Sequence, residues 1–315
     1  MDLKKINNCG FSLIELMVAM AIASIVLASI YRVYYNQQMA ATNQQLVIEM
    51  QQNARSALTL MKREIRMAGY KPAASDGIDN DGDTVIDGAD PDENGRSPGQ
   101  EIGIVQAMRD QIRFRMDIRP NDPNRCTNGA DDGGIAGIAD DPAECYDGLA
   151  DDPNEQITYA LQANAAGDGD DLVRITNTST GTKTDILAYD IEAIAFGYAY
   201  DWDGGIRDGA LETDNGQPDG NVFWAYDNNG NSQLDRNAET GAAFVGPLLI
   251  DIADGAPIIG AVRIWLLVRT PQPVKGDLDT QTYQVGDQVI DASTYDPAYR
   301  RTLQVATVFC RNMRF

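Results

Sequence analysis

The sequence has no histidine and few basic residues: 25 lysines and arginines stand against 47 aspartates and glutamates, for a formal net charge of −22. Without histidine, histidine-based catalysis and histidine metal sites are excluded. The shortage of basic residues argues against nucleic acid as a partner, because binding phosphates needs a basic face. The sequence also has no G-x-S-x-G nucleophile motif and no glycine-rich phosphate-binding loop, so it gives no support to an enzyme.

Glycine and proline are missing from a long N-terminal stretch, residues 11–68. Such a run is compatible with one helix, which at 1.5 Å per residue would form a rod of roughly 90 Å. Residues 11–31 are long and apolar enough to cross a bilayer, and they contain one charge, Glu15. A carboxylate there is costly without a partner, so Glu15 is a functional candidate. Lys4 and Lys5 indicate that the preceding end stays in the cytoplasm.

The stretch Gly10-Phe11-Ser12-Leu13-Ile14-Glu15-Leu16 resembles the class III signal of type IV prepilins and pseudopilins. In that family a membrane peptidase cuts between the glycine and the phenylalanine, and the new N-terminus is methylated. The resemblance implies cleavage between Gly10 and Phe11, after which Glu15 pairs with the Phe11 amine of a neighbouring subunit. Opposite charges attract strongly in a low-dielectric layer, so this pairing would drive assembly. An ordinary secretory signal peptide is the alternative, and the glutamate within the apolar region argues against it.

Beyond Asn36 the helix-compatible run becomes amphipathic, and Gly69 offers a stop. Apolar side chains recur at three- and four-residue steps, which is one face of a helix: Val47, Met50, Ala54, Ala57 or Leu58, Met61, Ile65 and Ala68. Strand patterns follow at residues 102–116, 156–161, 171–176, 185–200, 262–269 and 303–310. Together these patterns predict an α+β protein in which a long N-terminal helix packs on an antiparallel β-sheet. The resemblance makes this the type IV pilin fold, with acidic loop insertions.

Three further stretches narrow the resemblance to one branch of the prepilin family. The helix end NARSALTLMKREIRMAGY, residues 53–70, is similar to that of PilW-type minor pilins and of J-type minor pseudopilins of type II secretion. The segments AVRIWLLVRT and VATVFCRN near the C-terminus also fit. The resemblance implies four parts: a leader at 1–10, a transmembrane and assembly half of the helix at 11–35, an amphipathic half at 36–69, and a periplasmic β-rich domain at 70–315.

Acidic insertions interrupt the last part near residues 76–95, 126–155 and 201–240. The first, DGIDNDGDTVIDGADPDENG, resembles the aspartate-rich calcium repeats of thrombospondin type 3, although Thr84 replaces the turn glycine of an EF-hand. Its spacing would let a short loop curl its oxygens around one ion, and its like charges repel unless a cation binds. We therefore favour calcium over a disordered acidic loop. The expected ligands are Asp79, Asp81, Asp83, the Val85 carbonyl, Asp87 and Asp90.

The third insertion repeats this spacing more weakly. For its candidates, a turn loop rich in asparagine and glycine is as good an explanation as calcium. The candidates are Asp227, Asn229, Asn231, Asp235 and Glu239, with Asp201 and Asp203 upstream.

Cys126 and Cys145 bracket the second insertion. In an oxidising periplasm two cysteines that flank a loop most often pair, and closing a loop of about 20 residues would stabilise the fold by roughly 3 kcal/mol. Cys310 alternates with apolar neighbours, which predicts a small buried side chain. Other pairings stay open, because without Cys9 of the leader the cysteine count is odd.

The resemblance implies a minor pilin that helps to prime and assemble a type IV pilus, at or near its tip. The protein would sit in the inner membrane with its C-terminal domain in the periplasm, and then reach the cell surface in the pilus. Its expected partners are other minor pilins, the major pilin, prepilin peptidase and the inner membrane, and its expected cofactor is calcium. Two alternatives are a J-type minor pseudopilin of a type II secretion system and a calcium-dependent tip adhesin.

Overall fold

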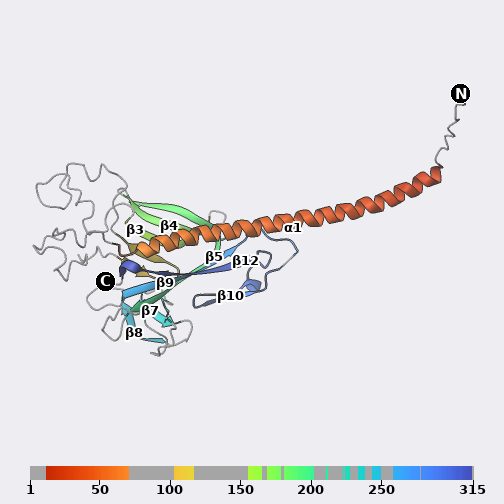
Figure 1. Ribbon diagram of the computed structural model, residues 1–315. Coiled ribbons are helices and arrows are strands. Elements are labelled where there is room, and N and C mark those ends of the chain that lie inside the picture. The colour runs from red at the N-terminus through yellow and green to blue at the C-terminus, as the bar shows by residue number, and fades with distance from the viewer. Residues whose placement is uncertain are drawn as a thin grey trace, which may run out of the picture.

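One helix, α1 (Leu13–Met67), runs through the N-terminal part of the chain and projects far beyond the strands (Figure 1). It contains neither glycine nor proline, so nothing in its sequence interrupts the ladder of backbone hydrogen bonds. Gly69 follows its C-terminal end with φ +77°, a conformation that glycine adopts without strain. The predicted helix over residues 11–68 and its glycine stop are confirmed over the part of the chain that the structure describes.

This is a computed structural model. It describes residues 12–70, 103–116, 155–164, 169–178, 181–201, 211, 222, 224–227, 233–237, 243–249, 258–276 and 278–313.

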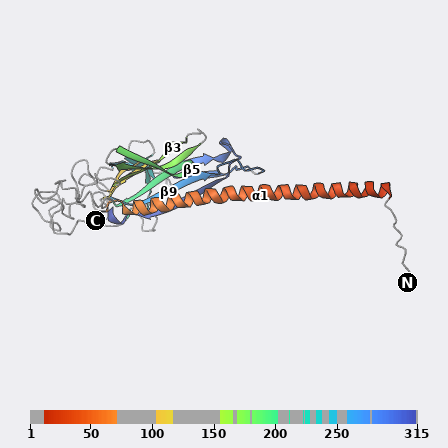
Figure 2. The same cartoon turned by 90° about the horizontal axis from the view of Figure 1, so that it is seen from above.

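An antiparallel sheet of ten strands packs along the C-terminal half of α1 (Figure 2). The order runs from β1 to β5, where the sheet branches: β6, β7 and β8 continue from one edge of β5, while β9 and then β12 follow on the other. The strands are β1 (Gly103–Ala107), β2 (Ile112–Arg115), β3 (Gln156–Ala163), β4 (Asp170–Thr178), β5 (Gly181–Asp201), β6 (Ala225–Tyr226), β7 (Gln233–Asn237), β8 (Ala243–Leu249), β9 (Ile258–Arg269) and β12 (Arg301–Phe309).

A separate hairpin, β10 (Thr282–Val285) and β11 (Gln288–Asp291), packs on the face of the sheet that points away from α1. The described residues also form two short 3₁₀ helices, η3 (Ala292–Thr294) and η4 (Arg311–Met313). The hairpin escaped prediction, although its sequence carries a signal. Two short alternating runs flank Gly286-Asp287, and Gly286 has φ +61°, as a tight two-residue turn requires.

Strand β5 changes partner at Asp190. Most of the strand before Asp190 pairs with β4, and the residues after it pair with β9. Asp190 has φ +58°, the one positive value among the non-glycine residues described, and aspartate tolerates this region better than most residues. Arg269 lies 3.9 Å from the Asp190 carboxylate, and its guanidinium fills the space that a side chain at residue 169 would need. Arg269 therefore supports the point at which β5 redirects.

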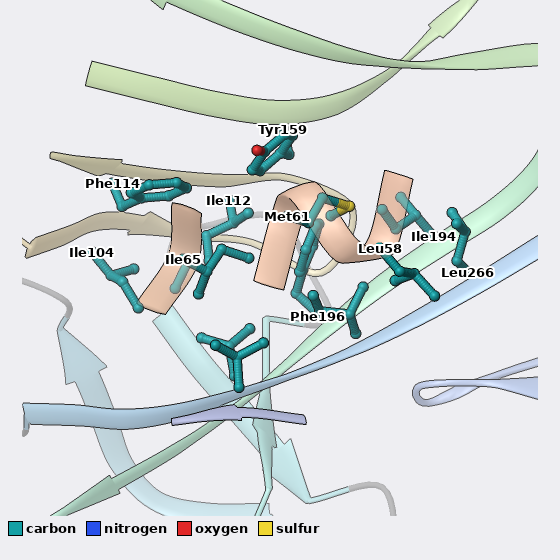
Figure 3. Close-up of a cluster of buried hydrophobic side chains, with 14 of the residues drawn as sticks. Leu58, Met61, Ile65, Ile104, Ile112, Phe114, Tyr159, Ile194, Phe196 and Leu266 are labelled. Atoms are coloured by element: carbon teal, nitrogen blue, oxygen red, sulfur yellow. The ribbon is translucent and has the colours of Figure 1, made fainter. Parts of the chain in front are cut away.

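The core lies between α1 and the sheet. The predicted apolar stripe of α1 is buried there except for Val47, which is half-buried against the same core. This confirms both the stripe and a sheet as its partner. Figure 3 shows Leu58, Met61 and Ile65 packed among side chains from five strands. The labelled side chains opposite them are Ile104 of β1, Ile112 and Phe114 of β2, Tyr159 of β3, Ile194 and Phe196 of β5, and Leu266 of β9.

The predicted strand patterns correspond to β1–β5, β9 and β12, with one correction. Residues 102–116, taken as one pattern, form two strands joined by a turn in which the Met108 N–H donates to the Gln111 carbonyl at 2.9 Å. The remaining strands lie where no pattern was recognised. Cys310 is fully buried, as predicted.

Candidate assembly site on the N-terminal helix

The N-terminal half of α1 presents apolar side chains to its surroundings. From Leu13 to Tyr35 the large ones are 49–77% exposed. A window of 18 residues in this helix has a mean hydropathy of 2.4 and none of it is buried, so α1 is long and apolar enough to cross a membrane. An exposed apolar surface of this size needs lipid or protein around it.

Glu15 interrupts this surface at the first turn of the helix. Its Oε2 accepts a hydrogen bond from the Ser12 backbone N–H at 2.9 Å, which satisfies a donor that the helix leaves open. Ile14, Val18, Ala19 and Ile22 line a shallow hollow together with Glu15. The carboxylate is thus held at the N-terminal end of α1, where the helix dipole also favours negative charge.

This capping role is a function of Glu15 that the sequence reasoning missed. The signal was present: Ser12-Leu13-Ile14-Glu15 is an S-x-x-E capping pattern ahead of an apolar run. Glu15 therefore has two roles to separate by experiment, a structural one in its own helix and the predicted pairing with a neighbour's amine. Gly10 and Phe11, the predicted cleavage residues, lie outside the described residues.

A half-buried polar contact fixes the other half of α1 to the sheet. Glu64 of α1 accepts hydrogen bonds from the Tyr159 hydroxyl of β3 and from the Arg174 guanidinium of β4, the latter at 2.9 Å. Burial, and then the negative charge of Glu64, raise the pKa of Tyr159 well above its usual value. The phenol stays protonated and donating, so helix and sheet are held in one register at this point.

The C-terminal end of α1 meets both ends of the acidic segment 71–102. The Gly69 N–H donates to the Arg115 carbonyl at 3.1 Å, and Arg115 pairs with Gly103 in the β1–β2 ladder. The Met313 sulfur packs against both glycines so closely that a Cβ on either would lie within 3 Å of it. Segment 71–102 therefore leaves and rejoins the fold at one place, opposite the exposed end of α1.

Two more acidic segments start and end at this pole. Segment 117–154 is closed at its base by a 3.0 Å hydrogen bond from the Met116 N–H to the Glu155 carbonyl, directly beside the β1–β2 ladder. Segment 202–257 joins the end of β5 to the start of β9. The start of β9 lies beside the end of β12, so it is close to Met313. We call this region, defined by the residues that bound the three segments, the distal pole.

The charge of the chain is divided sharply between these segments and the rest. Segments 71–102, 117–154 and 202–257 contain 29 of the 47 acidic residues and 6 of the 25 basic ones. The remaining chain, which includes α1 and most of the sheet, is close to neutral. The net charge of −22 is thus a property of what is attached to the distal pole.

Most of the predicted calcium ligands and both cysteines of the predicted disulfide fall outside the described residues, so these predictions stay predictions. They are Asp79, Asp81, Asp83, Val85, Asp87, Asp90, Asp203, Asn229, Asn231, Glu239, Cys126 and Cys145. Within the described ranges, no group of three or more acidic or cysteine side chains is arranged to hold a metal.

Three weaker calcium candidates have described backbones. Asp201 ends β5, while Asp227 follows β6 and Asp235 lies in its partner strand β7. Asp227 is only 1% exposed. Burial first, and then the charge of Asp227, raise the pKa of the Tyr198 hydroxyl. Asp227 therefore sits in the protein interior beside Tyr198.

Comparison with protein families gives two matches. A family described as the prokaryotic N-terminal methylation motif matches residues 5–31, and one described as type IV pilus-assembly protein W matches residues 158–312. Together the two matches support a PilW-type minor pilin. The PilW match runs from β3 to η4, so it includes much of the sheet that packs on α1. The matches imply assembly with other pilins into a pilus, which is a structural role.

Among solved structures, the type IV-like pilin TTHA1219 from Thermus thermophilus aligns with 84% of this chain and 98% of its own, at 11% identity and a TM-score of 0.33. Comparison with curated protein sequences gives no match.

Proposed function

We propose that this protein is a PilW-type minor pilin that primes assembly of a type IV pilus and remains at or near the filament tip. The observation that carries the proposal is the separation of its two ends: an exposed apolar helix at one end, and the distal pole with its acidic segments at the other. A subunit that docks through its helix and presents a different surface at the opposite end suits the start of a filament.

Docking would use Glu15 as well as the apolar surface. After cleavage following Gly10, the amine of Phe11 is a cation within the apolar layer. The carboxylate of Glu15 is an anion in the same layer. Pairing between subunits brings these two opposite charges together within the low-dielectric layer. In a lone subunit both charges stay poorly solvated. Each unpaired charge would then favour addition of the next subunit.

Two substitutions separate this charge pairing from helix capping. Glu15→Gln keeps an oxygen that can accept the Ser12 N–H but removes the charge, and Glu15→Ala removes both. We expect both variants to lose surface pili to a similar extent, while Glu49→Gln, an exposed acid on the same helix, assembles normally. Normal piliation of Glu15→Gln would leave capping as the role of this residue and contradict pairing.

A clean deletion distinguishes a pilus from a type II secretion pseudopilus, because both surface pili and secreted enzymes can be measured in one culture. Lost pili with intact secretion, restored by the wild-type chain, is the expected result. Intact pili with blocked secretion would assign the protein to a J-type minor pseudopilin. Mass spectrometry of the restored strain should find a mature N-terminal peptide that begins at methylated Phe11.

We propose further that segment 71–102 binds calcium through the six ligands predicted above, and that an ordered acidic segment at the distal pole serves adhesion. The concentration of aspartates supports a cation, since unneutralised like charges repel. Calcium, but not magnesium, should raise the melting temperature of the chain, and Asp81→Asn with Asp83→Asn should reduce that rise. Asp185→Asn, on β5, is the matched control. An unchanged melting temperature would contradict calcium binding.

A disulfide between Cys126 and Cys145 would brace segment 117–154. Trypsin leaves both cysteines in one peptide, because no lysine or arginine lies between them, whereas Glu-C cuts between them after Glu144. Non-reducing mass spectrometry of a Glu-C digest should find the two cysteines in two peptides joined by a disulfide. Finding either residue alkylated in the unreduced chain would contradict the pairing.

A further inference from the structure

We propose that Tyr31, Tyr34 and Tyr35 anchor α1 in the lipid headgroup layer and so fix how deeply the helix sits in the membrane before assembly. The three residues are spaced three and four apart, so they share one face of the helix. Their side chains are 69%, 59% and 49% exposed. The inference rests on the membrane anchoring of α1 in the proposed function.

The position of these tyrosines along the helix matches the thickness of a bilayer. From Leu13 to Tyr31 the helix rises about 27 Å at 1.5 Å per residue, against about 30 Å for a hydrocarbon core. Arg32, between the tyrosines, is the first charged residue after Glu15, and three polar residues follow at 36–38. The tyrosines therefore stand where the helix leaves the apolar layer, which is where aromatic rings with a polar tip are enriched.

The β-sheet domain leaves this face of the helix open. The Asn43 side chain, which donates to the Lys275 carbonyl at 3.2 Å, is about 12 Å beyond Tyr35 along the helix. At 100° per residue, the centre of the tyrosine face lies roughly 140° around the helix from the stripe that faces the sheet. Figure 2 shows the corresponding part of α1 extending beyond the strands. Lipid headgroups can thus reach all three rings.

The chemistry of this face fits lipid better than another helix. Close packing of helices within a membrane favours small side chains at the interface, whereas here three large rings and one arginine lie within five residues. Each tyrosine hydroxyl can hydrogen-bond to phosphates or carbonyls of the headgroups. The long side chain of Arg32 can place its charge among the phosphates while its stem stays in the apolar layer.

An anchor at this depth sets the position in the membrane from which the subunit moves into the filament. Glu15 lies about 24 Å below Tyr31 along the helix, close to the opposite face of the hydrocarbon layer. Moving the subunit into a filament then draws Glu15 across most of the bilayer, while the tyrosines move outwards without entering the hydrocarbon. The energy that holds the subunit before this step would come partly from the headgroup contacts.

The experiment measures the depth of α1 in vesicles of phosphatidylethanolamine and phosphatidylglycerol. The full chain carries Ile25→Trp as a reporter, since Ile25 is 69% exposed, and its fluorescence is quenched by lipids brominated at different depths. The same chain without the reporter supplies the background of the native tryptophans. The test variant replaces Tyr31, Tyr34 and Tyr35 with leucine, and its control replaces Tyr189 and Tyr295, which are exposed on the β-domain.

With leucines the apolar surface extends to residue 35, so we expect the reporter to move inwards by up to one helical turn, about 5 Å. The control should leave its depth unchanged. An unchanged depth in the leucine variant overturns the anchor, and if that variant also loses surface pili, the tyrosines contact a neighbouring helix instead. Failure of the wild-type chain to float with vesicles would overturn membrane anchoring itself, which separates the two proposals.

Discussion

The two halves of α1 are both rich in apolar residues, yet only one buries them within the chain. Met61 and Ile65 in the C-terminal half are 0% exposed, whereas Met20 and Ile25 in the N-terminal half are 65% and 69% exposed. The C-terminal half has one apolar face and charged residues on the others, while the N-terminal half has no charge between Glu15 and Arg32. A periodic apolar face thus indicates a partner in the same fold, and an apolar surface on all sides indicates one outside it.

The largest expected effect comes from replacing one methionine in each half of α1 with alanine. Met61→Ala should lower the free energy of unfolding by about 2–5 kcal/mol, because it leaves a cavity between α1 and the sheet. Met20→Ala, the same change at an exposed position, should leave it unchanged within about 0.5 kcal/mol. Urea unfolding in mild detergent, followed by tryptophan fluorescence, measures both. Equal losses in the two variants would contradict the division of the helix.

A smaller effect is expected from the polar contact between α1 and the sheet. Glu64→Gln removes the charge that Arg174 faces and weakens the bond from Tyr159, so the free energy of unfolding should fall by about 1–3 kcal/mol. Glu49→Gln is the control on the exposed side of the same helix. The same urea titration measures both variants. If Glu64→Gln loses no more unfolding free energy than the control, apolar packing alone holds α1 on the sheet.

Alkaline pH tests the same contact without a change at Glu64. Burial and the Glu64 charge raise the pKa of Tyr159 in the folded chain, while an unfolded tyrosine ionises near pH 10. The stabilisation is therefore complete below pH 10 and declines above it, by at most about 1.4 kcal/mol per pH unit for this residue. Tyr159→Phe should make the stability profile above pH 10 less steep, and Tyr189→Phe, on the surface, should not. Identical slopes in wild type and Tyr159→Phe would contradict this.

The smallest effect marks where the two halves meet. Asn43→Ala loses one hydrogen bond to the Lys275 carbonyl near the solvent, so the cost should be about 0.5–1 kcal/mol. Hydrogen exchange should quicken in the backbone around Lys275. Gln38→Ala, just over one turn closer to the exposed end, should leave exchange there unchanged; faster exchange in both would move the boundary towards the N-terminus.

Features set by local pattern could be predicted from the sequence. The stripe from Val47 to Ile65 follows the helical period, Gly69 is a residue suited to ending a helix, and Cys310 alternates with apolar neighbours in a strand. Each depends on residues close together in the chain. The antiparallel sheet followed because its long strands alternate clearly, and a helix with one apolar face needs a sheet or helix to cover it.

Features that join distant segments could not be predicted in the same way. Tyr159 and Arg174 lie 95 and 110 residues from Glu64, and nothing in the pattern around any of the three specifies the others. The change of partner in β5 depends on Asp190 adopting an uncommon backbone conformation beside Arg269. Glu15 combines two features: a charge within an apolar segment, which the sequence analysis interpreted as a pairing site, and a hydrogen bond in the helix cap, which it did not predict.

The closure of segment 71–102 against Gly69, Gly103 and Met313 has a consequence for how such proteins diversify. When both ends of a segment are held at one point of a rigid fold, doubling its length adds only about 0.6 kcal/mol of closure entropy. Segments 71–102 and 117–154 can therefore gain, lose or exchange residues over evolutionary time without shifting strand register or helix packing. The distal pole can thus change in sequence, while the helical end of the subunit is constrained by its packing in the filament.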